Sequence, residues 1–305
     1  MISKKPLLIC VVGPTAIGKT ALSIEIAKAF STEIISADSR QFYTEMKIGT
    51  AVPSEEELAA VPHHFIQTKS IFNSFNVGDF EKEALQKLEK LFKEQPVAVM
   101  VGGSGLYIDA VVKGLDSFPE VSSEVRSKLN EELLSNGIET LQKELEEIDP
   151  VYFQKADVQN PHRIIRALEI FRSSGKPYTS FLKNKANNRP FETQFIGLSA
   201  DRKLIYNRIN ERVDLMIASG LIEEAASLKV HKDLNALQTV GYRELFQFFD
   251  GKMSKEESIE EIKKNTRRFA KRQGTWFRKN DQISWYDYTT KASDIVRAIK
   301  IKNAL

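Results

Sequence analysis

The chain has 305 residues, of which 42% are hydrophobic and 28% charged, and its net charge is +3 at pH 7. That length suits one large core, or a core domain with a smaller one beside it. No segment reaches the roughly 20 apolar residues that a membrane span needs. A single cysteine and four histidines exclude a disulfide framework and leave no plausible structural zinc site. We therefore expect a cytoplasmic protein with no membrane segment.

The first half of the chain alternates between apolar strand patterns and amphipathic helix patterns. Strands are expected at 7–12, 33–37 and 97–101. Helices are expected after the first strand, through Phe30, and over 78–95. Strands that alternate with helices predict a parallel sheet covered on both faces.

The strand patterns disappear between residues 119 and 189. This stretch is polar, has helical spacing and is broken by glycines and prolines. A strand, a helix and a possible edge strand follow it, at 194–198, from Arg202 onward and at 283–286. We therefore expect a helical insertion domain at 119–189 within a sheet domain formed by 1–118 and 190–305. The end of the chain, after the last parallel strand, is expected to be mostly helical.

The segment 13–20 fits the pattern G-x-x-x-x-G-K-[ST] and lies between a predicted strand and a predicted helix. It consists of Gly13, Pro14, Thr15, Ala16, Ile17, Gly18, Lys19 and Thr20. The glycines let successive backbone N–H groups point at phosphate oxygens, and the helix adds its positive end. Lys19 supplies a charge, and the Thr20 hydroxyl could reach Mg²⁺. The pattern predicts a P-loop NTPase-like α/β core with a site for a diphosphate or triphosphate.

The carboxylate that usually accompanies this loop is missing from its usual place. ATP-driven P-loop proteins commonly end an apolar strand in an Asp that helps to hold magnesium, whereas the strand at 97–101 runs into 102–105, Gly-Gly-Ser-Gly. The nearest candidate is Asp38, at the end of the second strand and on the same edge of the sheet. Asp38 could be a magnesium ligand, a helix N-cap or a general base, and its spacing alone leaves all three open.

Basic residues crowd the stretch 262–280, which contains no acidic residue. A solvated helix face normally mixes charges of both signs, so a run of one sign indicates a polyanionic partner. An ordinary basic helix is the alternative. The residues are Lys263, Lys264, Arg267, Arg268, Lys271, Arg272, Arg278 and Lys279.

Further motifs, taken with the phosphate loop, resemble those of the tRNA dimethylallyltransferase (tRNA isopentenyltransferase) family. They are 38–43 (DSRQFY), 48–51 (IGTA), 61–64 (VPHH), 102–107 (GGSGLY), 160–163 (NPHR), 166–169 (RALE), 240–242 (VGY) and 266–277 (TRRFAKRQGTWF). The resemblance extends over nearly the whole chain, and the combination is specific even though the phosphate loop alone is not.

The resemblance implies a magnesium-dependent prenyl transferase that modifies tRNA. Such an enzyme moves a dimethylallyl group from dimethylallyl diphosphate to the exocyclic amino group of the adenosine just 3′ of the anticodon, at tRNA position 37. Its partners would be that diphosphate and the tRNA anticodon stem-loop, and we expect it to act as a monomer. The phosphate loop would hold the leaving diphosphate, and Mg²⁺ would neutralise the charge that develops on it.

The resemblance also implies roles for individual residues. Asp38 would accept the proton of the target amino group, and Ser104 would supply a hydroxyl where the family usually has Thr. Thr15, Arg202 and Arg208 match positions that face the diphosphate, although either arginine could be an exposed helix charge. Val52 stands where the family often has Lys. The residues expected to bind tRNA are Asp38, Ser39, Arg40, Gln41, Ser104, Arg126, Gln159, Asn160, Pro161, His162, Arg163, Arg268, Lys271 and Arg272.

Two other functions remain as alternatives. A small-molecule kinase would use the same phosphate loop for ATP but would not need the basic stretch. A non-catalytic RNA-binding protein would keep the basic stretch but would not need Asp38. Trp276 and Phe277 could stack on a base, but their helical spacing from Phe269 favours the core. His63 and His64 are expected to be structural.

Overall fold

The structure, a computed structural model, describes all residues except 1–4, 183–188 and 305. The chain divides into two compact units, each with its own hydrophobic core, and each is described by itself. The first unit is Met1–Lys113 with Asn188–Leu305, and the second is Gly114–Asn187. The sequence-based limits of the insertion, 119 and 189, differ from these by a few residues.

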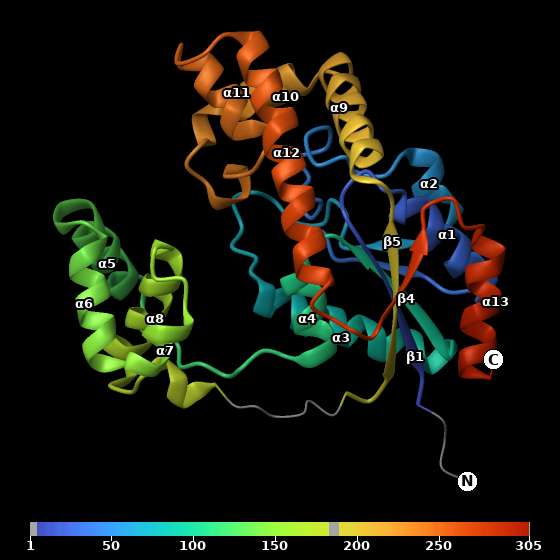
Figure 1. Ribbon diagram of the computed structural model, residues 1–305, viewed down its shortest axis with the longest axis horizontal. Helices are drawn as coiled ribbons and strands as arrows, with labels where there is room; N and C mark the ends of the chain where they lie inside the picture. Colours follow the sequence, from blue (N-terminus) through green and yellow to red (C-terminus); the bar gives the residue numbers. More distant parts are fainter. Residues whose placement is uncertain (1–4, 183–188, 305) are drawn as a thin grey trace. The chain divides into compact units, whose positions relative to one another are not determined.

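The first unit is built on a six-stranded sheet in the order β3-β2-β4-β1-β5-β6 (Figure 1). All neighbouring strands pair in parallel, as the alternation of strands and helices predicts. The edge strand expected at 283–286 is confirmed as β6. The two-residue β3 is not predicted because its two histidines carry no apolar pattern. The strands are β1 (Leu7–Val12), β2 (Ile34–Ser36), β3 (His63–His64), β4 (Val97–Gly102), β5 (Glu192–Ser199) and β6 (Ile283–Asp287).

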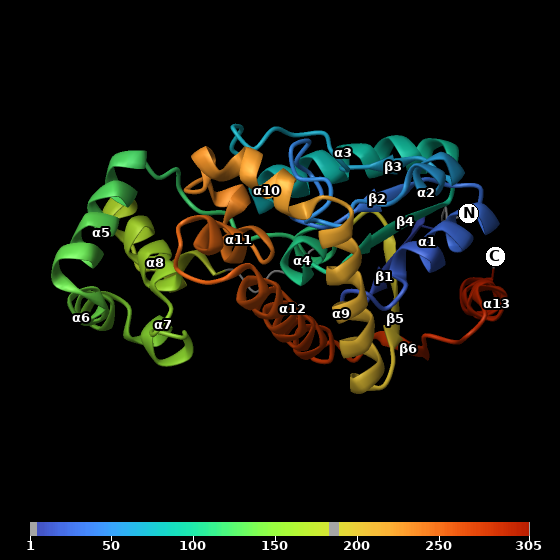
Figure 2. The same cartoon turned by 90° about the horizontal axis from the view of Figure 1, so that it is seen from above.

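Helices cover both faces of this sheet (Figure 2). Side chains of a strand alternate between its two faces. Accordingly, the even-numbered residues of β1 pack in one cluster with α3 and α4, and the odd-numbered ones in another with α1 and α13. All six residues of β1 are buried, which explains its continuous apolar pattern. The helices are α1 (Lys19–Ala29), α3 (Val77–Glu94), α4 (Gly105–Lys113) and α13 (Ala292–Asn303).

Further helices lie beyond the carboxyl ends of the strands (Figure 1). Three of them, α9 (Arg202–Ala218), α10 (Leu221–Leu228) and α11 (Tyr242–Phe249), pack together. The long α12 (Lys255–Phe277) runs back from this group to α4, and the short α2 (Glu55–Ala60) packs against α1. The helical C-terminal region is therefore confirmed. Among the described residues, no helix is both long and apolar enough to cross a membrane.

The described part of the second unit is helical, as expected for the insertion. Its elements are α5 (Ser123–Asn136), α6 (Ile138–Ile148), α7 (Pro150–Lys155), α8 (Pro161–Ser174) and the 3₁₀ turn η1 (Tyr178–Phe181). Leucines and isoleucines of α5, α6 and α8 form its core. The buried Asp149 carboxylate accepts hydrogen bonds from the backbone N–H groups of Tyr152, at 3.1 Å, and Thr179, at 2.8 Å. This carboxylate joins the start of α7 to η1 and thereby stabilises the second unit.

The close approach of β4 to the end of β2 yields a first prediction. A Cβ atom at Gly102 would lie 2.4 Å from the carbonyl oxygen of Ala37, a backbone atom that cannot swing aside. We expect Gly102→Ala to lower the free energy of unfolding by roughly 1–3 kcal/mol, the usual cost of overpacking. Urea unfolding followed by circular dichroism measures this change.

A matched glycine in α12 provides the control. A Cβ atom at Gly274 would lie 3.8 Å from the Arg278 side chain, an ordinary contact. Because alanine favours the helix, Gly274→Ala should keep or raise stability. Equal losses in the two variants would show that the contact with Ala37 is not the cause.

Candidate active site

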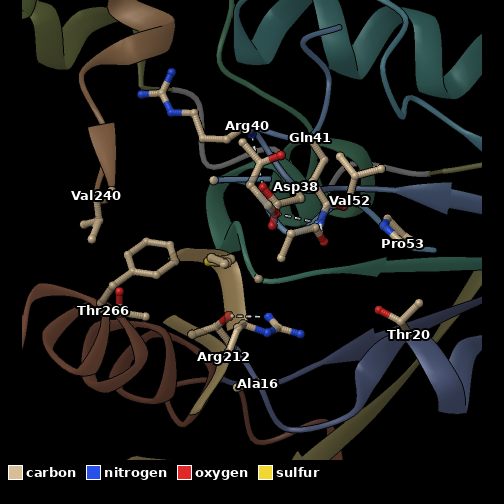
Figure 3. Close-up of a pocket in the computed structure, with 18 of the residues that line it drawn as sticks. Ala16, Thr20, Asp38, Arg40, Gln41, Val52, Pro53, Arg212, Val240 and Thr266 are labelled. Carbon is tan, nitrogen blue, oxygen red and sulfur yellow. Dashed lines mark hydrogen bonds between the residues drawn. The ribbon is translucent and has the colours of Figure 1, made fainter. Parts of the chain in front are cut away.

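A cavity of about 930 Å³ opens at the carboxyl edge of the sheet in the first unit (Figure 3). Its volume is within the range of small-molecule sites. Among the parts of the chain that line it are the phosphate loop, the segment 38–41, the loop 49–54, the end of β4, the segment 238–241, and the helices α9 and α12. Parallel α/β sheets bind ligands at this edge. The residues that the sequence singles out around Lys19 and Asp38 therefore converge on one cavity.

The phosphate loop has a conformation that only glycine adopts easily at two positions. Gly13 and Gly18 have φ angles of 144° and 105°. A Cβ atom at Gly13 would also lie 2.8 Å from the carbonyl oxygen of Leu198. Gly18 directly precedes α1, and the first residues of that helix line the cavity. The positive end of α1 is thus available to an anion in the cavity.

Lys19 is the cation of this loop. Its Nζ donates a hydrogen bond to the carbonyl oxygen of Pro14 at 2.7 Å. Burial lowers the pKa of Lys19 to about 7, the positive charge of Arg212 lowers it as well, and the negative charge of Asp38 opposes this shift. Because the pKa of Lys19 is this low, an anion that binds beside it stabilises the protonated, positively charged form of the side chain.

Arg212 of α9 brings a second cation to the cavity wall. Its Nη1 donates to the Thr15 hydroxyl at 3.3 Å, so it lies against the phosphate loop. Burial lowers the pKa of Arg212, and Asp38 acts in the opposite direction. Lys19 and Arg212 together make this side of the cavity suited to an anion with several charges.

The two arginines that the resemblance indicated lie elsewhere on α9. Arg208 lies over the ring of Tyr288, 5.4 Å from its centroid, and lines a smaller cavity of about 290 Å³. Arg202 is exposed at the start of the helix and lines neither cavity. Their contact with a diphosphate stays a prediction. Arg212 follows Arg208 by one helical turn, which is the sequence signal that could have found it.

Asp38 follows β2 and faces the same cavity (Figure 3). Its Oδ1 accepts a hydrogen bond from the backbone N–H of Arg40 at 3.1 Å. The residues after Asp38 form turns rather than a helix, so the N-cap interpretation is wrong. Oδ2 makes no hydrogen bond to any residue that the structure describes. A ligand in the cavity can therefore use this oxygen.

Ser104 fixes the segment that carries Asp38. Its hydroxyl accepts a hydrogen bond from the backbone N–H of Ser39 at 3.1 Å and donates to the Ser39 hydroxyl at 3.2 Å. Ser104 itself stands between the end of β4 and the start of α4. It thereby ties the end of β4 to the chain that follows β2.

Gln273 of α12, which the sequence does not single out, makes a second connection across the sheet edge. Its Oε1 accepts from the backbone N–H of Thr15 at 2.9 Å, and its Nε2 donates to the carbonyl oxygen of Gly103 at 3.1 Å. It is buried although its neighbours Lys271 and Arg272 are exposed. A neutral amide within the basic run is the signal that could have identified it.

Known proteins resemble this chain in sequence and in structure. The sequence model of the IPP transferase family matches residues 41–280. A tRNA dimethylallyltransferase of Christiangramia forsetii is 60% identical over 295 residues, which cover 97% of this chain and 98% of that protein. The chain belongs to the tRNA dimethylallyltransferase family. A tRNA dimethylallyltransferase of Flavobacterium johnsoniae is 55% identical and covers 96% of both chains.

Two solved structures of tRNA prenyl transferases share the fold. The tRNA isopentenylpyrophosphate transferase of Bacillus halodurans has a TM-score of 0.74 and 36% identity, and the match covers 98% of this chain and 97% of that one. A eukaryotic dimethylallyltransferase acting on tRNA has a TM-score of 0.80 and 26% identity, with 98% of this chain and 79% of that chain covered.

Only part of the basic stretch on α12 is free for a polyanion. Lys263 forms ion pairs with Asp214 and Glu260, and Lys264 pairs with Glu261. Five further cations of the stretch are exposed and pair with no acidic residue in the described part of the chain: Arg268, Lys271 and Arg272 within the helix, and Arg278 and Lys279 just after it. Arg272 also lines the cavity. Within this part of the helix, the cations available to a polyanion are therefore Arg268, Lys271 and Arg272, and their contact with tRNA stays a prediction.

The aromatic residues at the end of α12 divide between core and surface. Phe277 is buried, as the helical spacing predicts. Trp276 is 43% exposed, so the core interpretation is wrong for this residue. Its Nε1 donates a hydrogen bond to Asp109 Oδ2 at 3.1 Å. Its indole ring packs directly on Gly105, because a Cβ atom there would lie only 2.3 Å from the ring.

Gln41 and the two histidines contribute to the framework of the cavity. The Gln41 amide donates to the carbonyl oxygens of Thr50, at 3.1 Å, and Ala51, at 2.9 Å. His64 Nε2 lies 2.6 Å from a carboxylate oxygen of Glu33, and Nδ1 of its neighbour His63 lies 2.7 Å from the carbonyl oxygen of Val61. The tRNA contact expected of Gln41 stays a prediction, since its amide already bonds within the protein.

In the second unit, the residues that match the family's tRNA contacts lie on α5 and around the start of α8. The Asn160 side chain caps α8 by accepting from the backbone N–H of His162 at 3.1 Å. Arg126 forms a bidentate ion pair, at 2.7 and 3.1 Å, with Glu169, whose side chain is 1% exposed. Pro161 is the first residue of α8, and the exposed residues here are Gln159, His162 and Arg163.

The shifted pKa of Lys19 predicts a pH dependence of anion binding. Below pH 7 Lys19 is charged with or without an anion, so its titration leaves the affinity unchanged. Above pH 7 the free protein loses this proton and binding must restore it, because the anion raises the pKa of Lys19 in the complex. The affinity for inorganic diphosphate should therefore fall as the pH rises, by up to about tenfold per pH unit. Calorimetric titration from about pH 6 to about pH 9 measures this slope.

Lys19→Arg is the control for that titration. An arginine stays charged over the whole range, so its remaining pH dependence reports the ionisation of diphosphate itself. The same slope in both proteins would mean that Lys19 does not supply the titrating group.

Proposed function

We propose that this enzyme transfers a dimethylallyl group from dimethylallyl diphosphate to the exocyclic amino group of the adenosine at tRNA position 37, with release of diphosphate. One observation supports this most directly: Lys19 and Arg212 line the cavity on the phosphate-loop side, and the carboxylate of Asp38 lines the same cavity. This arrangement offers a place for a leaving diphosphate and a base for the attacking amine. Membership of the family supplies the identity of the two substrates.

The phosphate-loop side of the cavity stabilises the leaving group. As the bond between the allylic carbon and the diphosphate oxygen breaks, its electron pair leaves with the diphosphate. The backbone N–H groups of the loop, Lys19 and Arg212 face the place where this negative charge develops. The allylic carbon tolerates positive charge, so this stabilisation and correct positioning supply most of what the transfer requires.

Asp38 acts on the acceptor. The exocyclic nitrogen of adenosine attacks the allylic carbon, gains positive charge as the new bond forms, and becomes acidic. The free Oδ2 of Asp38 can orient the amino group by accepting a hydrogen bond and then take its proton. Ser104 holds the backbone of the neighbouring Ser39, which keeps this carboxylate in place.

Magnesium fits the cavity as a partner of the diphosphate. In the described residues no group of three or more His, Cys, Asp or Glu side chains could hold a metal ion by itself. Mg²⁺ commonly takes only one or two protein oxygens and completes its shell with phosphate oxygens and water. Thr20 lines the cavity and its Oγ1 bonds to no described residue, so it could serve as such a ligand, while Asp38 Oδ2 stays available to the amino group. The ion would neutralise charge on the diphosphate.

The target base is accessible because of its place in the tRNA. A base in the anticodon loop has no Watson–Crick partner, so turning it out of its stack costs less than in a duplex. Arg268, Lys271 and Arg272 could hold the phosphates of the loop while the base enters the cavity. Because one chain supplies all the groups used here, we also infer a monomer, and its tRNA substrate indicates the cytoplasm.

The direct test is mass spectrometry of tRNA nucleosides after incubation with the enzyme, dimethylallyl diphosphate and Mg²⁺. The adenosine at position 37 should gain the mass of one isoprenyl group in place of a hydrogen. Unmodified tRNA after incubation with folded enzyme would contradict the proposed function.

Asp38→Asn tests the general base in the same assay. The asparagine keeps the shape and one hydrogen-bonding oxygen but loses the charge and the basicity. We expect turnover to fall by about two or more orders of magnitude, the range for removal of a general base, with a far smaller change in tRNA affinity.

Glu57 provides a matched carboxylate for this experiment. It lines the same cavity, but its Oε2 accepts from the backbone N–H of Ser54 at 2.9 Å in the cap of α2. Glu57→Gln should therefore have a much smaller effect. Near-normal turnover in Asp38→Asn, or an equal loss in Glu57→Gln, would argue against the assignment of Asp38 as the base.

The basic surface of α12 predicts how tRNA binding depends on salt. The logarithm of the affinity should fall linearly with the logarithm of the salt concentration, because phosphate contacts release counterions. Replacing Arg268 and Arg272 by Ala should weaken binding to all tRNAs and reduce the slope by roughly one to two units. Filter binding at several salt concentrations measures this slope.

Lys263 and Lys264 are the matched control because both already pair with acidic residues. Replacing these two lysines by Ala should change the slope much less. A larger change in this control than in the Arg268 and Arg272 variant would place the tRNA surface elsewhere on the helix.

A further inference from the structure

Glu224 of α10 holds the backbone of a loop that the mechanism does not use directly. Its Oε2 accepts from the N–H groups of Lys47, at 3.0 Å, and Ile48, at 2.7 Å. Its Oε1 accepts from the N–H of Gly49 at 2.9 Å and from the Tyr242 hydroxyl at 2.6 Å. One carboxylate thus binds three consecutive backbone N–H groups and a phenol, which uses its full acceptor capacity.

Tyr242 completes this connection through its ring. A Cβ atom at Gly49 would lie 2.6 Å from Cε2 of Tyr242, so the loop backbone rests directly on the ring. Tyr242 is fully buried at the start of α11. Burial and the nearby Glu224 carboxylate raise the pKa of Tyr242, so its hydroxyl remains a donor. Two motifs without a direct chemical role, 48–51 and 240–242, therefore meet at Glu224.

The held loop leads back to the reacting groups. Thr50 and Ala51, the next two residues, accept both hydrogen bonds from the Gln41 amide, and the loop continues as one wall of the cavity. Gln41 closes the turn that begins at Asp38. A displacement of the loop would therefore move the segment 38–41 relative to the phosphate loop.

We propose that Glu224 is a positioning residue for prenyl transfer, which sets the place of Asp38 by holding the backbone of residues 47–49. This inference rests on the proposed function, since it assigns Glu224 to the acceptor side of that reaction. Glu224 does not line the cavity. Its effect reaches Asp38 through Gln41, whereas the phosphate loop is held separately by Gln273 and Arg212.

The Glu224→Gln variant tests this because an amide cannot replace the carboxylate here. Each Glu224 oxygen accepts two hydrogen bonds, so the NH₂ group of the glutamine would face two donors, such as the N–H groups of Lys47 and Ile48 that now bond to Oε2. We expect the single-turnover rate with both substrates saturating to fall at least about tenfold, because small displacements of reacting groups are costly. The dissociation constant for inorganic diphosphate should stay within about twofold, since the phosphate loop is held independently.

Two further variants make the test specific. Tyr242→Phe keeps the ring against Gly49 but removes one hydrogen bond to Glu224, and should slow the single turnover by only a few-fold. Glu223 is an exposed neighbour of Glu224 on the same helix, and Glu223→Gln should leave the rate unchanged. A purely structural role would lower the melting temperature and the active fraction, without a selective loss of rate at unchanged diphosphate affinity.

Hydrogen exchange of the backbone gives a readout that does not depend on activity. In Glu224→Gln the amides of residues 47–51 and 38–41 should exchange faster than in the parent protein, and those of 13–20 should not change. Unchanged exchange at 38–41, a rate within about twofold of the parent, or parallel loss of diphosphate binding would each overturn the inference. If Glu224→Gln does not fold, a normal single-turnover rate in Tyr242→Phe overturns it.

The same experiments separate this inference from the proposed function. A parent protein that transfers no isoprenyl group contradicts the proposed function, while the exchange measurement still shows whether Glu224 holds the segment 38–41. An active parent whose rate is insensitive to Glu224 contradicts the inference alone.

Discussion

The active site depends on a concentration of positive charge at the carboxyl edge of the sheet. The phosphate loop, the end of α1, Lys19 and Arg212 all direct positive potential into one cavity, and burial holds the pKa of Lys19 near 7. Such a concentration of donors and cations is stable only within a rigid scaffold. The parallel sheet supplies that scaffold, and its close contacts at Gly13 and Gly102 explain why glycines stand there.

Most of the fold follows from the sequence because its signals are local. Periodicity and the glycines of the loop predict the buried strand 7–12, the glycine-rich loop and the helix after it. The structure places all three as expected. The helical character of the insertion follows from the lack of strand patterns. The short β3 escapes prediction because its pairing with β2 is set by tertiary contacts rather than by an apolar pattern.

The site is less predictable because its hydrogen bonds join residues that lie far apart in the sequence. Asp38 and the phosphate loop can be placed from strand ends alone, but the choice of Arg212 over its neighbours on α9 depends on which way the helix turns. Gln273 and Glu224 bond to backbone groups 170 or more residues away, and no motif indicates these partners. Trp276 follows the spacing of a core residue and still lies at the surface, since Gly105 leaves room for its ring there.

Gln273 has a consequence for how the two substrates communicate. It sits on the same helix as Arg272 and bonds to the backbone of the phosphate loop at Thr15. If RNA shifts α12, the geometry of the diphosphate cradle shifts with it. Thermodynamic linkage makes such an effect reciprocal, so a diphosphate in the loop must change RNA affinity by the same factor. In that case a single buried amide would make the enzyme a coupled two-ligand system rather than two independent sites on one scaffold.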